Sequence, residues 1–447
     1  MTGSLSGLRV LVVGLGRLGG GVTVTRWLVG RGARVTVTDL ADAEELGGSV
    51  AQISDLDVVL RLGGHRADDL DGVDLVVVNP AVDKSRSEFF GEVLRRGVSW
   101  TTEMNLFCER CRAPVIGVTG TYGKSTTCAM LAEVLHSRLA AGGCEYTGVH
   151  LGGNIGLSLL MELDSIKATD LVVLEMSNAQ LEDLPRVPWA PRVSVITNLR
   201  PNHLDRHGSW EAYARAKLNI VMDPHGESTI ILGDVGSDVR AMLEELVPNA
   251  GSRLVDIEPA DPPVELKIAG AHNRRNADCV LTIGRCLGLD EPIVRAALGE
   301  FTGLPHRLEC VWTVDGVDYV NDSKSTTPAA TVTAIECFDG PIVAIVGGKD
   351  RGVSLSDCAS ALVRSCRAVV CIGESGPAFA RAIRDVEGRR AQPAVHECDD
   401  LDEGLQVARG CAVPGDTVLY APGCPSFDAY ANFEHRGRRF AELVQAL

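Results

Sequence analysis

One pattern of apolar and polar positions recurs along the chain. A short apolar run rich in β-branched residues is followed by a glycine-rich or polar turn, and then by a stretch with the periodicity of an amphipathic helix. The first copy lies within residues 8–32 and contains LRVLVV, GLGRLG and VTVTRWLVGRG. Strands that alternate with helices in this way are typical of parallel sheets, so an α/β fold is predicted.

The copies of the pattern fall into three blocks of ordinary domain size. Residues 1–110 contain the expected strands RVTVTDL and DLVVVNP. Residues 111–303 contain DLVVLEMS, VSVITNL and the helical SWEAYARAKLNIVM, and residues 304–447 repeat the theme in PIVAIVGGKD and AVVCIGES. A domain boundary is expected at TGLPHRLE, because glycine and proline interrupt the helical periodicity there.

Charge and composition narrow the class of protein. The 447 residues carry a formal charge of -16, which argues against a general affinity for nucleic acid or for an anionic membrane. No apolar run approaches the roughly 20 residues that span a bilayer, and a secretory signal pattern is missing, so a cytoplasmic protein is expected. A monomer is expected as well, although the sequence carries no direct signal of oligomeric state. The fourteen cysteines are scattered, and the close pair Cys108 and Cys111 lacks further ligands at zinc spacing.

The stretch GVTGTYGKSTT, residues 117–127, has the composition of a loop that binds nucleotide phosphates. Glycine-rich backbone at the start of a helix directs amides toward a phosphate, Lys124 adds a positive charge, and the Ser125 hydroxyl can hold magnesium. The common spacing would place a glycine where Val118 stands. An ordinary turn between a strand and a helix therefore remains the alternative.

The N-terminal GLGRLG matches the glycine fingerprint of dinucleotide-binding domains. Its glycines are Gly14, Gly16 and Gly19, and Asp39 closes the next expected strand, where an acid that binds ribose would lie. Taken alone, this fingerprint favours a nicotinamide-dependent oxidoreductase, with a merely structural turn as the close alternative.

Polar residues gather just past the ends of expected strands, which is where open α/β sheets bind their ligands. The residues at such positions are Glu175, Asn198, His203, Asp322, Lys324 and Lys349. Carboxylate and imidazole groups there can ligate magnesium, and lysines can neutralise phosphate or carboxylate charge. The alternative for each residue by itself is a solvated loop position.

Two further stretches contain candidate residues whose simplest interpretation is structural. In GAHNRRN, Asn273 lies near a helix start and is explained by capping, and in GLPHRLE, Arg307 is explained by an ion pair at the domain boundary. Lys217 lies among small and apolar residues in AYARAKLNI. Its simplest interpretation is a stem packed on the apolar face with the ammonium in water.

Taken together and in order, these motifs resemble the Mur ligase family over essentially the whole chain, and within it the glutamate-adding branch. The motifs are GVTGTYGKSTT, LGGNIG, EMSNAQLE, NLRPNHLDRHGSWEAYARAKLNI, GAHNRRN, GLPHRLE, NDSKSTTP, VGGKDRG and PGCPSFDAYANFEHRG. The resemblance implies a Rossmann-like N-terminal domain, a central P-loop ATPase domain with a mostly parallel sheet, and a Rossmann-like C-terminal domain. It also explains the loop spacing, since the family uses a Gly-Thr-x-Gly-Lys-Ser/Thr loop.

The resemblance implies an ATP-dependent amide ligase of peptidoglycan synthesis that joins glutamate to UDP-N-acetylmuramoyl-L-alanine through an acyl phosphate. The implied ATP site comprises Gly120, Thr121, Gly123, Lys124, Ser125, Thr126, Asn273, Arg307 and Asp322. The implied UDP-sugar site comprises Gly14, Gly16, Asp39 and Asn154, and the implied glutamate site comprises Lys324, Thr326, Lys349, Ser426 and Phe433. Two magnesium ions are implied on Ser125, Glu175, His203 and a carbamate of Lys217, and the implied catalytic residues are Lys124, Lys217, His203 and Glu175.

Several positions depart from the family pattern. They are Tyr122 for the usual asparagine, Asn178 and Ala179 for serine and phenylalanine, the turn NPAV for Ser-Pro-Gly, Asn202 for aspartate, and the PGCPS motif. Tyr122 and Asn202 lie nearest the implied chemistry. A catalytically weak or divergent ATP-binding relative with another substrate is therefore the alternative function.

Overall fold

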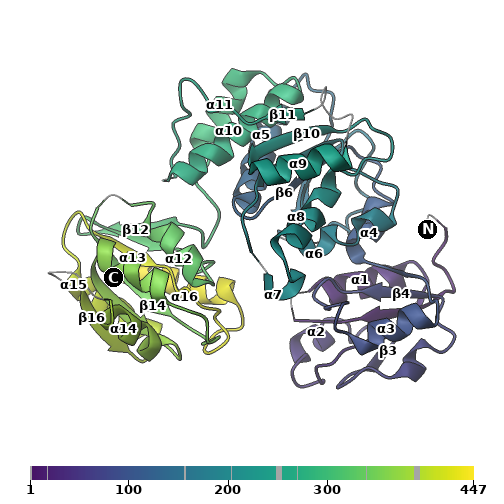
Figure 1. The fold of residues 1–447 in the computed structure, drawn as a ribbon, viewed down its shortest axis with the longest axis horizontal. Coiled ribbons are helices and arrows are strands. Elements are labelled where there is room, and N and C mark those ends of the chain that lie inside the picture. The colour runs from purple at the N-terminus through teal and green to yellow at the C-terminus, as the bar shows by residue number, and fades with distance from the viewer. Residues whose placement is uncertain are drawn as a thin grey trace. The chain divides into compact units, whose positions relative to one another are not determined.

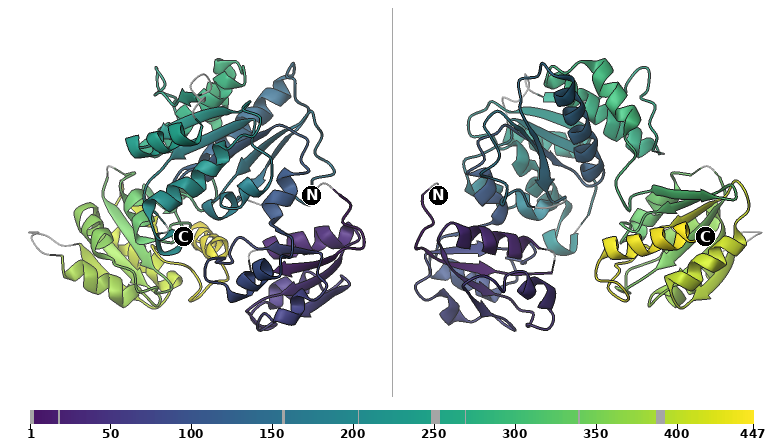
Figure 2. Two further views of the ribbon diagram at one scale, coloured as in Figure 1. Left: turned by 45° about the vertical axis from the view of Figure 1, so that its right-hand side comes forward. Right: turned by 180° about the vertical axis from the view of Figure 1, so that it is seen from behind.

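The computed structural model contains three β-sheets, each with helices packed against it (Figure 1), and Figure 2 shows them from two further directions. It describes residues 3–17, 19–155, 158–202, 204–247, 254–268, 270–338, 340–386 and 393–447. The predicted α/β fold with three domains is confirmed. The chain divides into two compact units, one of residues 1–263 and 276–298, the other of residues 264–275 and 299–447. The domain boundaries expected near residues 110 and 303 stay predictions.

The first sheet has five parallel strands in the order β3-β2-β1-β4-β5, the order expected of a Rossmann-like domain. Its strands are β1 (Arg9–Val13), β2 (Arg34–Thr38), β3 (Val58–Arg61), β4 (Leu75–Val78) and β5 (Trp100–Thr101). Its helices are α1 (Gly20–Gly30), α2 (Gly47–Ala51), α3 (Glu88–Arg95) and α4 (Glu103–Cys108). Val10 and Val12 pack in one core and Leu11 and Val13 in another, so β1 is covered on both faces.

The second sheet has six parallel strands in the order β11-β10-β9-β6-β8-β7. The strands are β6 (Val115–Thr119), β7 (Val149–Gly153), β8 (Leu171–Glu175), β9 (Val193–Asn198), β10 (Thr229–Asp234) and β11 (Leu254–Asp256). The helices are α5 (Lys124–Ala141), α6 (Asn178–Leu181), α7 (Leu204–His207), α8 (Trp210–Leu218), α9 (Ser237–Leu246), α10 (Ala271–Cys286) and α11 (Glu291–Glu300). Every residue of β6 and β8 is buried, as expected for central strands of a parallel sheet.

The third sheet also has six strands, in the order β12-β13-β17-β14-β15-β16, and only the β12–β13 pair is antiparallel among those described. The strands are β12 (Glu309–Val314), β13 (Val317–Asn321), β14 (Ile342–Gly347), β15 (Cys366–Ile372), β16 (Ala394–Cys398) and β17 (Thr417–Tyr420). The helices are α12 (Pro328–Ile335), α13 (Ser356–Ser365), α14 (Gly376–Arg384), α15 (Leu401–Cys411) and α16 (Phe433–Gln445).

Among the described residues, the structure contains no helix that is both long and apolar enough to cross a membrane.

Candidate functional site

The loop between β6 and α5 has, at two positions, a backbone conformation that residues with a side chain rarely adopt. Gly120 and Gly123 have φ angles of 149° and 80°. A Cβ atom on Gly120 would overlap the Thr197 hydroxyl, and one on Gly123 would overlap the side-chain oxygen of Asn276. The loop is therefore held tightly, and helix α5 begins directly behind it at Lys124.

The end of β9 holds this loop in place. The loop, residues 120–123, is the candidate ATP-binding loop and is called the ATP loop below. The amide of Thr121 donates to the carbonyl oxygen of Asn198 at 2.9 Å, and the amide of Tyr122 donates to the Asn198 side chain at 3.0 Å. Thr197 donates its hydroxyl to the Tyr122 carbonyl at 2.7 Å, while Lys124 Nζ folds back onto the Thr121 carbonyl at 3.0 Å. Ser125 is buried and Thr126 half-buried in the first turn of α5, where helix amides and the helix dipole favour an anion.

Glu175 ends β8 as a buried carboxylate in which one oxygen accepts a hydrogen bond and the other accepts none from the described residues. Asn154 Nδ2 donates to Oε1 at 2.9 Å, and the Asn154 amide donates to the Glu175 carbonyl at 2.9 Å. Oε2 has no hydrogen-bond partner among the described residues, although the side chain is only 1% exposed. A buried, charged oxygen without a donor is costly, so this geometry fits a cation ligand.

Lys217 lies in α8 with its side chain 1% exposed, so the interpretation of an ammonium in water is wrong. Its Nζ lies 3.3 Å from Thr119 Oγ1, which itself donates to the Met176 carbonyl at 2.8 Å. Burial, with a contribution from nearby Lys124, holds the pKa of Lys217 well below its usual value, against the opposing effect of Glu175. A lowered pKa raises the fraction of Lys217 present as the free amine, the form that can react with carbon dioxide.

Side chains of neighbouring residues pack against and hydrogen-bond to the glycine fingerprint of the first sheet. Gly14 and Gly16 have φ angles of 91° and 64°, and a Cβ on Gly14 would lie 2.9 Å from the Cβ of Asn79. Asp39 accepts the amides of Gly16 at 3.0 Å and of Ala41 at 2.9 Å. Asp39 therefore stabilises the glycine loop itself, a role that the fingerprint alone did not predict.

The candidate residues of the second unit gather near the ends of β13 and β14. Lys324 Nζ lies 3.6 Å from the centre of the Phe433 ring, a cation–π contact. Asp322 is buried and accepts the Leu308 amide at 3.1 Å. Burial raises the pKa of Asp322, opposed by its hydrogen bonds and by Arg307.

Lys349 pairs with Glu374 at 2.6 Å, and this partner raises the pKa of Lys349. The Lys349 amide donates to the Pro425 carbonyl at 2.9 Å, next to buried Ser426. Asn273 is buried in the first turn of α10, and Thr326 is half-buried after β13. The structure thus places the glutamate-site candidates in one unit, while His203 lies outside the described residues.

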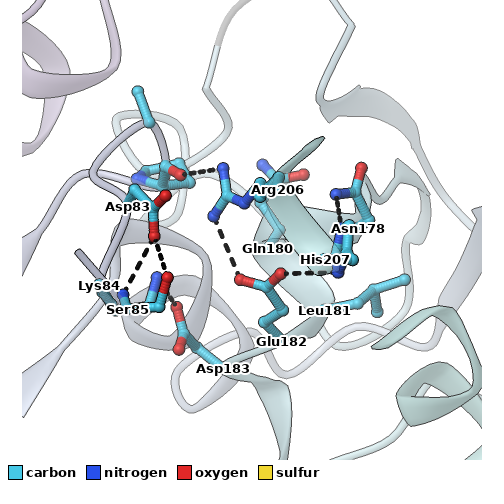
Figure 3. Close-up of polar contacts among 12 residues, drawn as sticks. Asp83, Lys84, Ser85, Asn178, Gln180, Leu181, Glu182, Asp183, Arg206 and His207 are labelled. Carbon is cyan, nitrogen blue, oxygen red and sulfur yellow. Dashed lines mark hydrogen bonds and ion pairs between the residues drawn. The ribbon is translucent and has the colours of Figure 1, made fainter. Parts of the chain in front are cut away.

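Sequence reasoning missed a polar network that joins the first two sheets (Figure 3). Arg206 in α7 binds Glu182 and the Pro80 carbonyl, and Lys84 pairs with Asp183 at 3.0 Å. Arg206 does belong to the NLRPNHLDRHGSWEAYARAKLNI motif, but only its long-range contacts distinguish it from a surface arginine.

The fold and the loop geometry define the class of protein as an α/β protein with a loop of the kind that binds nucleotide phosphates. Family models match all three sheets: "Mur ligase MurD-like, N-terminal domain" over residues 8–100, "Mur ligase middle domain" over 118–282, and "Mur ligase, glutamate ligase domain" over 306–424.

Curated relatives match the chain over nearly its full length. Proteins from Symbiobacterium thermophilum and Roseiflexus sp., both called UDP-N-acetylmuramoylalanine--D-glutamate ligase, are 36% and 35% identical. The alignments cover 98% of both chains in the first case and 99% of both in the second. The chain belongs to the Mur ligase family, and the predicted resemblance is confirmed.

Solved structures agree on the fold. UDP-N-acetylmuramate-alanine ligase MurC from Thermotoga maritima has a TM-score of 0.58 at 20% identity, and covers 98% of this chain and 99% of its own. Folylpolyglutamate synthase from Mycobacterium tuberculosis, solved with ADP, has a TM-score of 0.55 at 17% identity, and covers 76% of this chain and 93% of its own. At these identities the likeness supports the fold alone.

Proposed function

We propose that this protein is an ATP-dependent ligase that joins D-glutamate to UDP-N-acetylmuramoyl-L-alanine. The observation that carries the proposal is the buried carboxylate of Glu175 at a strand end, whose Oε2 has no hydrogen-bond partner among the described residues. Lys217 lies close enough to Glu175 and to Lys124 for both charges to shift its pKa. The names of the full-length relatives supply the substrates.

In the proposed reaction, a carboxylate oxygen of the UDP-sugar acceptor attacks the γ-phosphorus of ATP. The bond from that phosphorus to its bridging oxygen breaks, ADP leaves, and an acyl phosphate forms. The neutral amine of glutamate then attacks the acyl carbon, phosphate leaves with the electrons of the carbon–oxygen bond, and the amine loses a proton to solvent. Lys124, released from the Thr121 carbonyl, would offset charge on the transferred phosphoryl group.

Magnesium would screen the phosphate charges during the first step. Its proposed ligands are Ser125, the open oxygen of Glu175, His203 and a carbamate on Lys217. The open Glu175 oxygen and the burial of Lys217, which lowers the pKa of its amine, support this assignment. Two ions, as expected from the family, stay a prediction.

The proposed division of labour follows the three sheets. Residues 1–110 would hold the UDP-sugar through Gly14, Gly16 and Asp39, with Asn154 contributed by residues 111–303, which would bind ATP. Residues 304–447 would hold glutamate through Lys324, Thr326, Lys349, Ser426 and Phe433. Asn273, Arg307 and Asp322 would complete the nucleotide site, and a cytoplasmic monomer remains the prediction.

The test is phosphate release from ATP with magnesium and UDP-N-acetylmuramoyl-L-alanine, in the presence of D-glutamate, L-glutamate or no amino acid. Release that requires D-glutamate and is lost in Lys217→Ala would support the ligase. Binding of ATP without release under any of the three conditions would favour a divergent relative with another substrate. Labelled bicarbonate and carbon NMR would detect a carbamate on the wild-type protein and none on the variant.

A further inference from the structure

Two neighbouring carboxylates after α6, Glu182 and Asp183, hold the segment that follows β4. Asp183 pairs with Lys84 at 3.0 Å, and the two side chains are only 6% and 13% exposed. Glu182 accepts a hydrogen bond from Arg206 Nη2 at 3.1 Å, and the other arm of Arg206, Nη1, donates to the carbonyl oxygen of Pro80 at 3.2 Å (Figure 3). Arg206 is therefore shared between the first sheet and the second.

The turn that Arg206 holds is the one that closes over the glycine fingerprint. Asn79, next to Pro80, donates from Nδ2 to the Gly14 carbonyl at 3.2 Å. The same side chain leaves no room for a Cβ on Gly14. A displacement of the Asn79–Pro80 turn would therefore displace the backbone proposed to hold the nucleotide-sugar.

The other side of this network reaches the ATP loop. His207, next to Arg206, lies 3.4 Å from Glu182 through Nδ1, and its ring packs edge-on against Tyr213 at 5.3 Å. The Tyr213 hydroxyl lies 3.2 Å from Thr121 Oγ1 in the loop before α5. A continuous set of contacts thus runs from the Asn79–Pro80 turn through α7 to the ATP loop.

We propose that Arg206 is a positioning residue that fixes the position of the glycine fingerprint, where the nucleotide-sugar is proposed to bind, relative to the loop before α5, where ATP is proposed to bind. The inference rests on the proposed ligase function, because only a reaction between the two bound substrates requires that these loops keep a fixed relative position. In-line attack on a phosphoryl group tolerates little misplacement, and an error of about 1 Å can cost up to about a hundredfold in rate. The planar guanidinium can reach a carbonyl and a carboxylate at once, whereas a lysine ammonium holds these two partners less well.

The experiment compares Arg206→Gln and Arg206→Lys with the wild type in the phosphate-release assay. Arg206→Gln should lower kcat/KM for the UDP-sugar acceptor by about tenfold to a hundredfold, and leave KM for D-glutamate and the Kd for ATP within about twofold. Arg206→Lys should recover part of the loss. The matched control is Arg215→Gln, which removes an arginine that pairs with Glu211 on its own helix α8 and with Glu245 on α9, and which should change none of these constants.

A double variant separates positioning from general stabilisation. If Arg206 acts through the Asn79–Pro80 turn, then Asn79→Ala and Arg206→Gln should be non-additive in acceptor kcat/KM. Additive effects, or an Arg206→Gln enzyme whose melting temperature falls while its kinetic constants match the wild type, would overturn the proposal. A wild-type protein that releases no phosphate would instead remove the proposed function, and this inference with it.

Discussion

Asn154 holds one oxygen of the Glu175 carboxylate at 2.9 Å and leaves the other oxygen without a partner among the described residues. The two residues come from neighbouring parallel strands, since Asn154 follows β7 and Glu175 ends β8. The hydrogen bond fixes the direction of the open oxygen. A fixed, charged and buried oxygen is the arrangement that a metal ligand requires.

Glu175→Gln should therefore lose activity through its metal requirement. The amide keeps the size of the side chain but removes the charge, so we expect kcat to fall by at least about a hundredfold and half-maximal activity to need more magnesium. Magnesium titrations of phosphate release would measure both. Glu162→Gln, which alters a half-exposed carboxylate, is the control, and an unchanged magnesium dependence in Glu175→Gln would contradict the assignment.

Lys217 should make wild-type stability depend on pH. Burial lowers its pKa in the folded protein, so between that lowered pKa and the usual 10.5 the unfolded chain binds more protons. Stability should rise with pH across this window and be lowest below it. In buffer depleted of carbon dioxide, Lys217→Met should therefore melt above the wild type near neutral pH, and the gap should narrow toward pH 10.5. A gap that does not change with pH would show that the amine stays charged when folded.

Tyr122→Asn should have little effect, although Tyr122 departs from the family pattern in the ATP loop. The Tyr122 side chain is 49% exposed, and the contacts that hold this part of the loop use its backbone amide and carbonyl. We expect the free energy of unfolding to change by no more than about 0.5 kcal/mol, as for an ordinary surface substitution, and the Kd for ATP to stay close to the wild-type value. Thermal melting and ATP titration would measure the two quantities. A larger gain in ATP affinity would mean that the tyrosine ring obstructs the site.

Glu374→Gln should strengthen glutamate binding. Lys349 pairs with Glu374 at 2.6 Å, and that pair competes with the proposed pairing between Lys349 and a substrate carboxylate. Because an exposed ion pair contributes little, KM for D-glutamate should fall by only about two- to fivefold. Lys349→Gln should raise the same KM, and equal values for Glu374→Gln and the wild type would show that Glu374 does not compete.

The central strands could be predicted from sequence, and the edge strands could not. Strands β6, β8 and β14 are buried on both faces, so each reads as an uninterrupted apolar run. Strand β3 lies at an edge of the first sheet, alternates between half-buried and exposed residues, and went unpredicted. Residues 97–107 contain β5 and the start of α4, which Thr102 caps, and the place of β5 is set by its pairing with β4.

The sequence by itself determined the family, the three-part α/β organisation and the candidate residues, because each depends on residue types at local spacings. The tertiary structure decided the environment of those residues. It showed that Lys217 is buried, that Glu175 has an open oxygen and that Asp39 holds its own glycine loop. It also revealed Arg206, whose partners Pro80 and Glu182 lie 126 and 24 positions away in the chain. Burial and long-range hydrogen bonding arise only when the sheets pack together, so local sequence patterns do not specify them.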